Sequence, residues 1–150
     1  MATNNVINNT FMGTQTNNDA AAGFIGEFVS SVIAAASEVT VADATATNIT
    51  SIALTAGDWD VWGNVVLNTL GTANVSMYGW TSVTSASLPD SSLRNALNLA
   101  PTVLAAGTAI QVPYARYSLA APTTIYLSCY QNQSAGTTKF CGGIYARRAR

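Results

Sequence analysis

The sequence contains no histidine, a single lysine and only two cysteines among its 150 residues. Histidine is the commonest general base and the commonest metal ligand, so its absence removes most catalytic triads and most metal sites. Two cysteines cannot form a zinc site alone, and the glycine-rich phosphate-binding and nucleophile-elbow motifs are also missing. We therefore expect no cofactor and no metal. The enzymatic alternative that remains is a hydrolase using acids only, with Glu27, Glu38, Asp58 and Asp60 as its candidates.

Charge is scarce as well, at 9% of residues against roughly 25% in a typical soluble domain. The net charge of −1 provides no field that would attract nucleic acid or an anionic membrane, so neither is an expected partner. Few surface charges also mean weak repulsion between copies, which favours an oligomer over a monomer. The basic residues concentrate at the C-terminal end, in Arg147, Arg148 and Arg150. This group is either a solvated end or a partner for acidic groups on a neighbouring subunit.

Long hydrophobic runs are absent. The most apolar segment, residues 20–36, is interrupted by Glu27 and is too short and too polar to span a bilayer. The first residues, MATNNVINNT, lack the basic and hydrophobic regions of a secretory signal. We expect neither membrane insertion nor export.

Short runs of β-forming residues make up most of the chain, and Gly, Ala, Asn and Thr clusters separate them. Their spacing predicts an all-β fold, an antiparallel β-sandwich or jelly roll of about eight strands. Residues 85–107 are the exception, since Asp90 could cap one or two helical turns there, and a long loop fits equally well. The expected strands are 24–33, 38–41, 49–54, 58–67, 73–83, 109–119, 123–131 and 138–147.

Residues 1–22 are rich in Asn and Thr and show little hydrophobic period, whereas residues 23–150 carry the strand pattern. A polar segment of this kind stays disordered unless a partner holds it. We interpret residues 1–22 as an attachment arm and 23–150 as the folded domain. The apolar residues expected to anchor the arm are Val6, Ile7, Phe11 and Met12.

The stretch GDWDVWGNVVL raises the question of catalysis directly. Alternation along a strand places Trp59 and Val61 on an apolar face, and Asp58 and Asp60 on the other face with Trp62. Two carboxylates at i and i+2 lie roughly 7 Å apart, between the spacings of retaining and inverting glycosidases. Catalysis needs one desolvated acid with a raised pKa, and both aspartates are expected to be wet at the start of the strand. We interpret them as solvated acids or as partners for an arginine.

Large aromatic residues fall on the faces not assigned to the core. If 59–67 and 73–83 form a hairpin, Trp62, Tyr78 and Trp80 share its outer face. Such a set is expected to be a subunit interface first, an extra buried layer second and a sugar-binding platform third.

The two cysteines lie on the last two expected strands. If these strands form a hairpin, matching their apolar faces turns Cys129 inward and Cys141 outward. We therefore predict two free thiols, as in a reducing compartment, and no disulfide.

Three segments resemble a family of tailed-phage virion proteins. They are TATNITSIALTAGDWDVWGNVVL (45–67), TSVTSASLPD (81–90) and the closing TTIYLSCYQ with GGIYARRAR (123–131 and 142–150). The leader NNTFMGTQTNNDAAAG is similar to the leaders of such chains, and the likeness spans most of residues 10–150. The chain departs from the family in its two cysteines and in Trp62, where relatives often carry serine.

The resemblance implies a β-rich, trimerising domain without catalytic residues, found in fibres, tail-associated proteins and head decorations. With no long shaft in this sequence, it implies a head-surface fibre or decoration protein of the virion, assembled in the bacterial host cytoplasm. The expected partners are other copies in a homotrimer, and phage capsid or tail proteins. The alternative is a tail-fibre receptor-binding module that recognises host surface glycans through Trp62, Tyr78 and Trp80.

Overall fold

The computed structural model describes residues 19–69, 76–98, 104–133 and 136–150. Ten β-strands and two short 3₁₀ helices make up its regular structure, without any α-helix among the described residues. The strands are β1 (Phe28–Ile33), β2 (Val39–Val41), β3 (Thr47–Leu54), β4 (Gly57–Thr69), β5 (Ser76–Ser82), β6 (Asn95–Asn98), β7 (Ala109–Gln111), β8 (Ala115–Leu119), β9 (Thr123–Asn132) and β10 (Thr138–Arg148). The 3₁₀ helices are η1 (Ala35–Ser37) and η2 (Ser91–Leu93).

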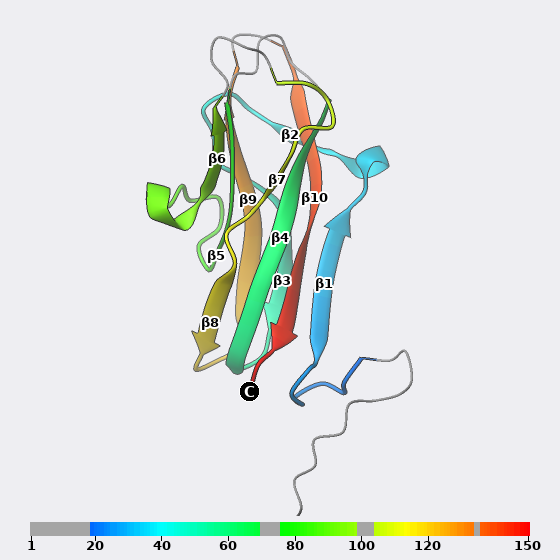
Figure 1. The fold of residues 1–150 in the computed structure, drawn as a ribbon, viewed down its shortest axis with the longest axis vertical. Helices are drawn as coiled ribbons and strands as arrows, with labels where there is room; N and C mark the ends of the chain where they lie inside the picture. The colour runs from blue at the N-terminus through cyan, green and yellow to red at the C-terminus, as the bar shows by residue number, and fades with distance from the viewer. Residues whose placement is uncertain (1–18, 70–75, 99–103, 134–135) are drawn as a thin grey trace, which may run out of the picture.

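The strands form two antiparallel sheets packed face to face (Figure 1). The six-stranded sheet has the order β1-β10-β4-β7, with β2 beside β10 and β8 beside β4. The four-stranded sheet has the order β3-β9-β5-β6. Because β1 and β2 lie end to end along β10, and β7 and β8 along β4, each sheet has four strand positions. The chain passes repeatedly from one sheet to the other, which is the arrangement of a jelly roll. The predicted fold class is confirmed.

Alternation along β4 places Trp59, Val61, Val65 and Leu67 in the core, where each is fully buried. Side chains from the facing β9 meet them, including Ile125 and Leu127. Burial of this apolar area provides the main stabilisation of the sandwich. The face predicted from the sequence to be apolar is therefore the core face.

Both hairpins expected from the sequence are wrong. β4 and β5 lie in different sheets, and so do β9 and β10. Each member of these pairs finds its hydrogen-bonding partners among strands distant in sequence, such as β10 with β4. In a jelly roll consecutive strands commonly face each other across the core. The side-chain alternation predicted along each strand therefore holds, whereas the predicted pairing of consecutive strands does not.

The described residues between 85 and 107 follow neither of the two alternatives alone. Asp90 precedes the single 3₁₀ turn of η2, without a side-chain capping hydrogen bond. Leu97 lies on β6, a strand that neither alternative included, and pairs with Met77 of β5. The second half of the fold therefore gains a strand that the sequence did not predict.

Candidate functional site

The two most distinctive sequence stretches meet at one end of the sandwich. Arg148, near the end of β10, lies opposite Trp59 of β4, and its guanidinium carbon is 4.4 Å from the centre of the indole ring. Its Nε donates to Glu27 Oε2 over 2.9 Å, and its Nη1 donates to the Ala56 carbonyl over 2.8 Å. We call Glu27, Asp58, Trp59, Arg148 and Arg150 the base cluster. The start of β4, which carries the GDWD stretch, and the end of β10, which carries the arginine-rich end, lie side by side there (Figure 1).

Glu27 is the acidic half of a buried ion pair in this cluster. Its backbone also pairs with Arg148, since the Arg148 amide donates to the Glu27 carbonyl over 2.9 Å. Burial alone would raise the pKa of the Glu27 carboxyl, but hydrogen bonds from the Gly23 amide and Arg148 lower it on balance. The start of β1 is therefore held to the end of β10 by a charged and by a main-chain contact. Sequence reasoning missed this role, although Glu27 stood out as the interruption of an apolar segment.

Asp58 is buried rather than wet, which corrects the expectation for this residue. Arg150 and Arg116 both form ion pairs with its carboxylate, the latter at 3.3 Å. A hydrogen bond from Ser118, together with Arg150 and Arg116, lowers the pKa of Asp58 to about 2. The second interpretation, a partner for arginine, is confirmed.

Asp60 lies two residues further along the same face. Arg116 and Arg147 are its neighbours in register on β8 and β10. The hydroxyl of Tyr114 donates a hydrogen bond to Asp60, which raises the pKa of that tyrosine. A general acid requires a raised carboxyl pKa, whereas Asp58 has a lowered one. The arrangement therefore suits ion pairing between strands better than acid catalysis.

Trp62 lies on the outer face of the six-stranded sheet, as alternation predicts. It is directly opposite Tyr145 of β10, with ring centroids 6.1 Å apart and ring planes 21° apart. Phe28 of β1 completes the group, 6.1 Å from Trp62 and 6.3 Å from Tyr145. We call Phe28, Trp62 and Tyr145 the aromatic shelf. Sequence reasoning found Trp62 and missed the other two, because strand pairing brings them together.

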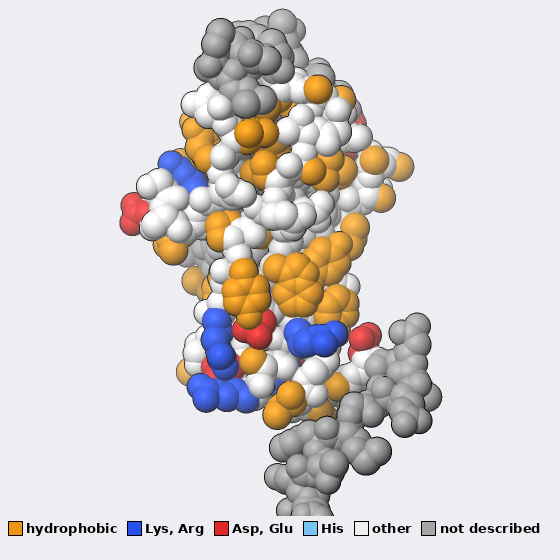
Figure 2. Space-filling view, viewed as in Figure 1, with side chains coloured by type: hydrophobic (Ala, Val, Ile, Leu, Met, Phe, Trp, Pro, Cys, Tyr) orange, Lys and Arg blue, Asp and Glu red, His pale blue; other side chains and the backbone are white. Residues whose placement is uncertain are grey.

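Glycine allows the shelf to lie flat. A Cβ atom at Gly143 would be 2.7 Å from the Tyr145 hydroxyl oxygen, so only glycine leaves room for the ring to extend over that position. The three rings are half-buried. Figure 2 shows hydrophobic side chains in a band over this face, above a group of basic and acidic side chains. The shelf is thus an apolar surface beside a charged one.

Tyr78 and Trp80 do not join Trp62. They lie on β5, on the outer face of the other sheet, where Tyr78 packs edge-on against Tyr130 and beneath Arg94. Trp80 is fully buried although it is not part of the central core cluster. Asn48, beside Ser128 and Trp80 in register, accepts a hydrogen bond from the Ala86 amide over 2.8 Å. We infer that the loop after β5 covers the indole, which corresponds to the extra buried layer among the sequence alternatives.

The three C-terminal arginines have different surroundings. Arg148 is buried within the chain and cannot be part of an exposed platform. Arg150 pairs with Asp58 of the same chain, while Arg147 is exposed. Val6, Ile7, Phe11 and Met12 of the expected arm lie outside the described residues.

Both cysteines are free and buried, which confirms the absence of a disulfide. Cys129 lies in the core, and Cys141 lies on the outer face of the six-stranded sheet. Burial raises the pKa of both thiols, most strongly that of Cys129. Neither thiol is therefore suited to act as a nucleophile.

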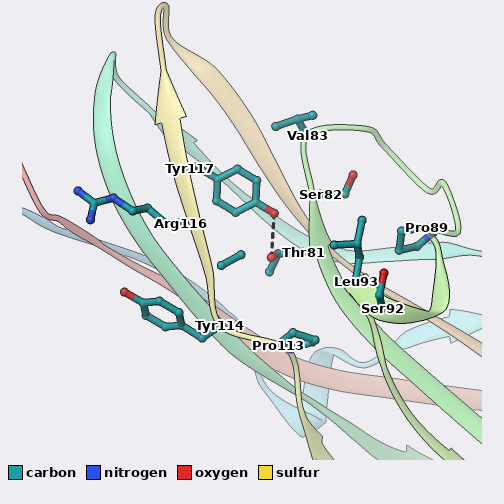
Figure 3. Close-up of a pocket in the computed structure, with 11 residues that line it drawn as sticks. Thr81, Ser82, Val83, Pro89, Ser92, Leu93, Pro113, Tyr114, Arg116 and Tyr117 are labelled. Atoms are coloured by element: carbon teal, nitrogen blue, oxygen red, sulfur yellow. Dashed lines mark hydrogen bonds between the residues drawn. The ribbon is translucent and has the colours of Figure 1, made fainter.

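A pocket of about 370 Å³ opens where β8 faces the loop after β5 (Figure 3). Tyr114, Arg116 and Tyr117 line one side, and Val83 and Leu93 line the other. Its volume falls within the range of small-ligand sites, roughly 300–1,000 Å³. Sequence reasoning missed this pocket, because its two walls come from different sheets.

Among the described residues, no group of three or more Asp, Glu or Cys side chains is arranged to hold a metal ion. Within the same residues, no helix is long and apolar enough to cross a membrane.

The comparisons with known proteins are sparse. No protein-family model matches the sequence, and no curated protein matches it. Among solved structures, the chain is similar to the "infectious bursal disease virus VP2 subviral particle", with a TM-score of 0.46 and 13% sequence identity. The match covers 92% of this chain and 37% of that one. A likeness at this level does not indicate a function.

Proposed function

We propose that this protein is a structural component of a bacteriophage virion. In this account it is a non-enzymatic head-surface fibre or decoration protein that forms homotrimers and docks on the particle through residues 1–22. The resemblance of residues 45–67 and 142–150 to tailed-phage virion proteins supports it, as does the jelly-roll fold. The two buried free thiols fit assembly in the host cytoplasm.

The observation that carries the proposal is the base cluster. Two of the segments that carry the resemblance, 45–67 and 142–150, meet there, where the Arg148 guanidinium lies over the Trp59 ring. The same cluster holds the point where the chain enters the domain, since Gly26 donates to the Arg148 carbonyl over 3.0 Å and Glu27 pairs with the Arg148 side chain. A load on an N-terminal arm would therefore be borne by β10, a central strand. Such an anchor serves a protein tethered by its N-terminus.

Deletion of residues 1–22 tests the attachment role. The deletion ends before Gly23, whose amide bonds to Glu27, so the base cluster stays complete. We expect the truncated protein to remain folded and oligomeric but to be missing from purified particles. Particle incorporation equal to that of the full chain would contradict the arm hypothesis. A tag of similar length in place of residues 1–22 controls for the mere presence of an extension.

A second candidate function is recognition of a surface glycan, and the aromatic shelf favours it. Nearly parallel aromatic rings offer flat apolar faces, and Asp60 and Arg147 beside them offer hydrogen-bonding groups. The set differs from the one expected, because Phe28 and Tyr145 replace Tyr78 and Trp80. Glycan-array binding that is lost with Trp62→Ala and kept with Tyr78→Ala, on the opposite sheet, would support it. Equal binding by both variants and the unmodified protein would contradict it.

A further inference from the structure

The large apolar side chains that are exposed gather mainly in two places. Phe24 and Ile25, just before β1, are 68% and 60% exposed. Leu93, Tyr114 and Val83 are 61%, 63% and 50% exposed, and all three line the pocket beside β8. Exposed apolar groups cost free energy, so their concentration at two sites indicates surfaces that become covered. We call the first site the apolar turn and the second the edge pocket.

Hydrogen bonds hold the backbone of the apolar turn in a defined conformation. The Phe24 amide donates to the Ala21 carbonyl over 3.1 Å, and the Glu27 amide donates to the Phe24 carbonyl over 3.0 Å. Gly23 and Gly26, on either side, adopt positive φ angles of 86° and 89°, which side chains other than glycine rarely tolerate. The Glu27–Arg148 ion pair fixes the end of the turn to β10. The two apolar side chains are thus held out from the domain.

The edge pocket is preformed. Tyr117 and Thr81 share a hydrogen bond of 3.0 Å across it, which joins the two sheets (Figure 3). Tyr114 is oriented by its hydrogen bond to Asp60. Most of the wall is apolar, and the charged side chain in the wall is Arg116. A volume of about 370 Å³ accommodates an aromatic and an aliphatic side chain together.

The two sites lie at opposite edges of the six-stranded sheet. The apolar turn leads into β1 at one edge, and the edge pocket adjoins β8 at the other, with β10 and β4 between them (Figure 1). One chain therefore cannot fill its own pocket with its own turn. Between two copies, contact of unlike surfaces is head-to-tail, and repetition of such a contact closes into a ring when the rotation permits.

We propose that the apolar turn of one copy inserts into the edge pocket of the next, with Phe24 and Ile25 packed between Leu93 and Tyr114. The proposal rests on the self-association put forward above and specifies its geometry. Charge is compatible with it, since Asp19, the exposed acid before the turn, would approach the rim where Arg116 lies. The Arg116 side chain pairs with Asp58 of its own chain and is still 51% exposed. A three-membered ring built this way presents three N-terminal segments from equivalent positions.

Cysteine cross-linking tests the contact. Ile25→Cys and Leu93→Cys place one thiol on each surface, and the buried native cysteines contribute little background. We expect oxidation of the two single variants, mixed after subunit exchange, to give covalent dimers in denaturing gels, because each chain then carries one introduced thiol. Oxidation of the double variant, which carries a thiol on both surfaces, should give covalent dimers and trimers. Each single variant alone is expected to give none, because like surfaces do not meet. The control pairs Leu93→Cys with Val32→Cys, which is 58% exposed on another surface and should not cross-link.

The outcomes separate this proposal from the one on which it rests. Covalent trimers in the double variant, with circular dichroism unchanged, support the inserted turn. Oligomers by light scattering without that cross-link overturn it and leave self-association standing. Cross-linking of Ile25→Cys with itself overturns it in favour of a two-fold contact. A monomer at all concentrations overturns both.

Discussion

At the scale of single residues, the arginine-rich end acts mainly within its own chain. Arg148 caps the core by lying over Trp59, and Arg150 neutralises the buried Asp58. A planar guanidinium suits the first position, because it stacks on a ring while donating several hydrogen bonds. Two of the three C-terminal arginines therefore form ion pairs within their own chain and are not free in solvent.

The low pKa of Asp58 predicts a pH dependence of stability. Its pKa falls from the ordinary 3.8 to about 2 on folding, so the ionised form contributes stability above pH 4. This contribution is lost as the pH falls from about 4 to about 2. The Tm of the protein should therefore exceed that of Asp58→Asn at neutral pH, and the difference should shrink across this window. Parallel Tm curves for the two proteins would contradict the assignment.

Gly57 occupies a position that only glycine fits. Its φ of 133° is unfavourable for other residues, and a Cβ atom there would collide with the Arg148 guanidinium. Gly57→Ala should reduce the free energy of unfolding by about 1–3 kcal/mol, measured by urea denaturation. Gly107→Ala is the matched control, since Gly107 also has a positive φ but no atom within 4 Å of an added Cβ. Equal losses in the two variants would show that Arg148 plays no part.

At the scale of elements, most strands were predictable and their neighbours were not. The exceptions are β6, which was not expected, and β7 and β8, which were expected as one strand over 109–119. Alternation identified the buried face of β4 and the outward direction of Trp62 and Cys141, because side-chain direction is a local property of extended backbone. Strand pairing depends on which strands, distant in sequence, lie edge to edge in a sheet. Consecutive strands of this fold often lie in different sheets, so a single strand does not reveal its partners. The aromatic shelf and the edge pocket follow from pairing, so sequence reasoning could supply only some of their members.

The contact between β1 and β10 should depend on the Glu27–Arg148 pair. Arg148→Met leaves the Glu27 carboxylate buried without its partner, which should cost about 3–5 kcal/mol of unfolding free energy. Adding Glu27→Gln to that variant removes the uncompensated charge and should recover part of the loss. Chemical denaturation of the two single variants and the double variant measures this coupling. Additive losses would mean that the two side chains do not interact.

The loop after β5 is fastened to the four-stranded sheet by Asn48. This side chain donates to Ser85 over 2.7 Å and accepts from the Ala86 amide. The buried Trp80 and Asn48 both pair in register with Ser128. Asn48→Ala should cost about 1–3 kcal/mol and increase acrylamide quenching of tryptophan fluorescence. A Trp62→Phe background removes the half-exposed indole that would mask the change. Unchanged quenching would show that another contact holds the loop.

At the scale of the whole molecule, different surfaces of the fold carry different structural features. One end is locked by the base cluster where the N-terminal segment enters, one sheet carries an aromatic shelf, and one edge carries a pocket. With few charges to repel neighbouring copies, these surfaces suit a protein that assembles. This is the architecture we expect of a virion component that works by binding.

Localisation on the particle tests this account most directly. Antibodies against residues 23–150, applied to purified phage particles and viewed by immunogold electron microscopy, report where the protein resides. The account predicts gold at regular positions on the particle surface, with no labelling of particles that lack the protein. Gold confined to host-cell material, with bare particles, would contradict it.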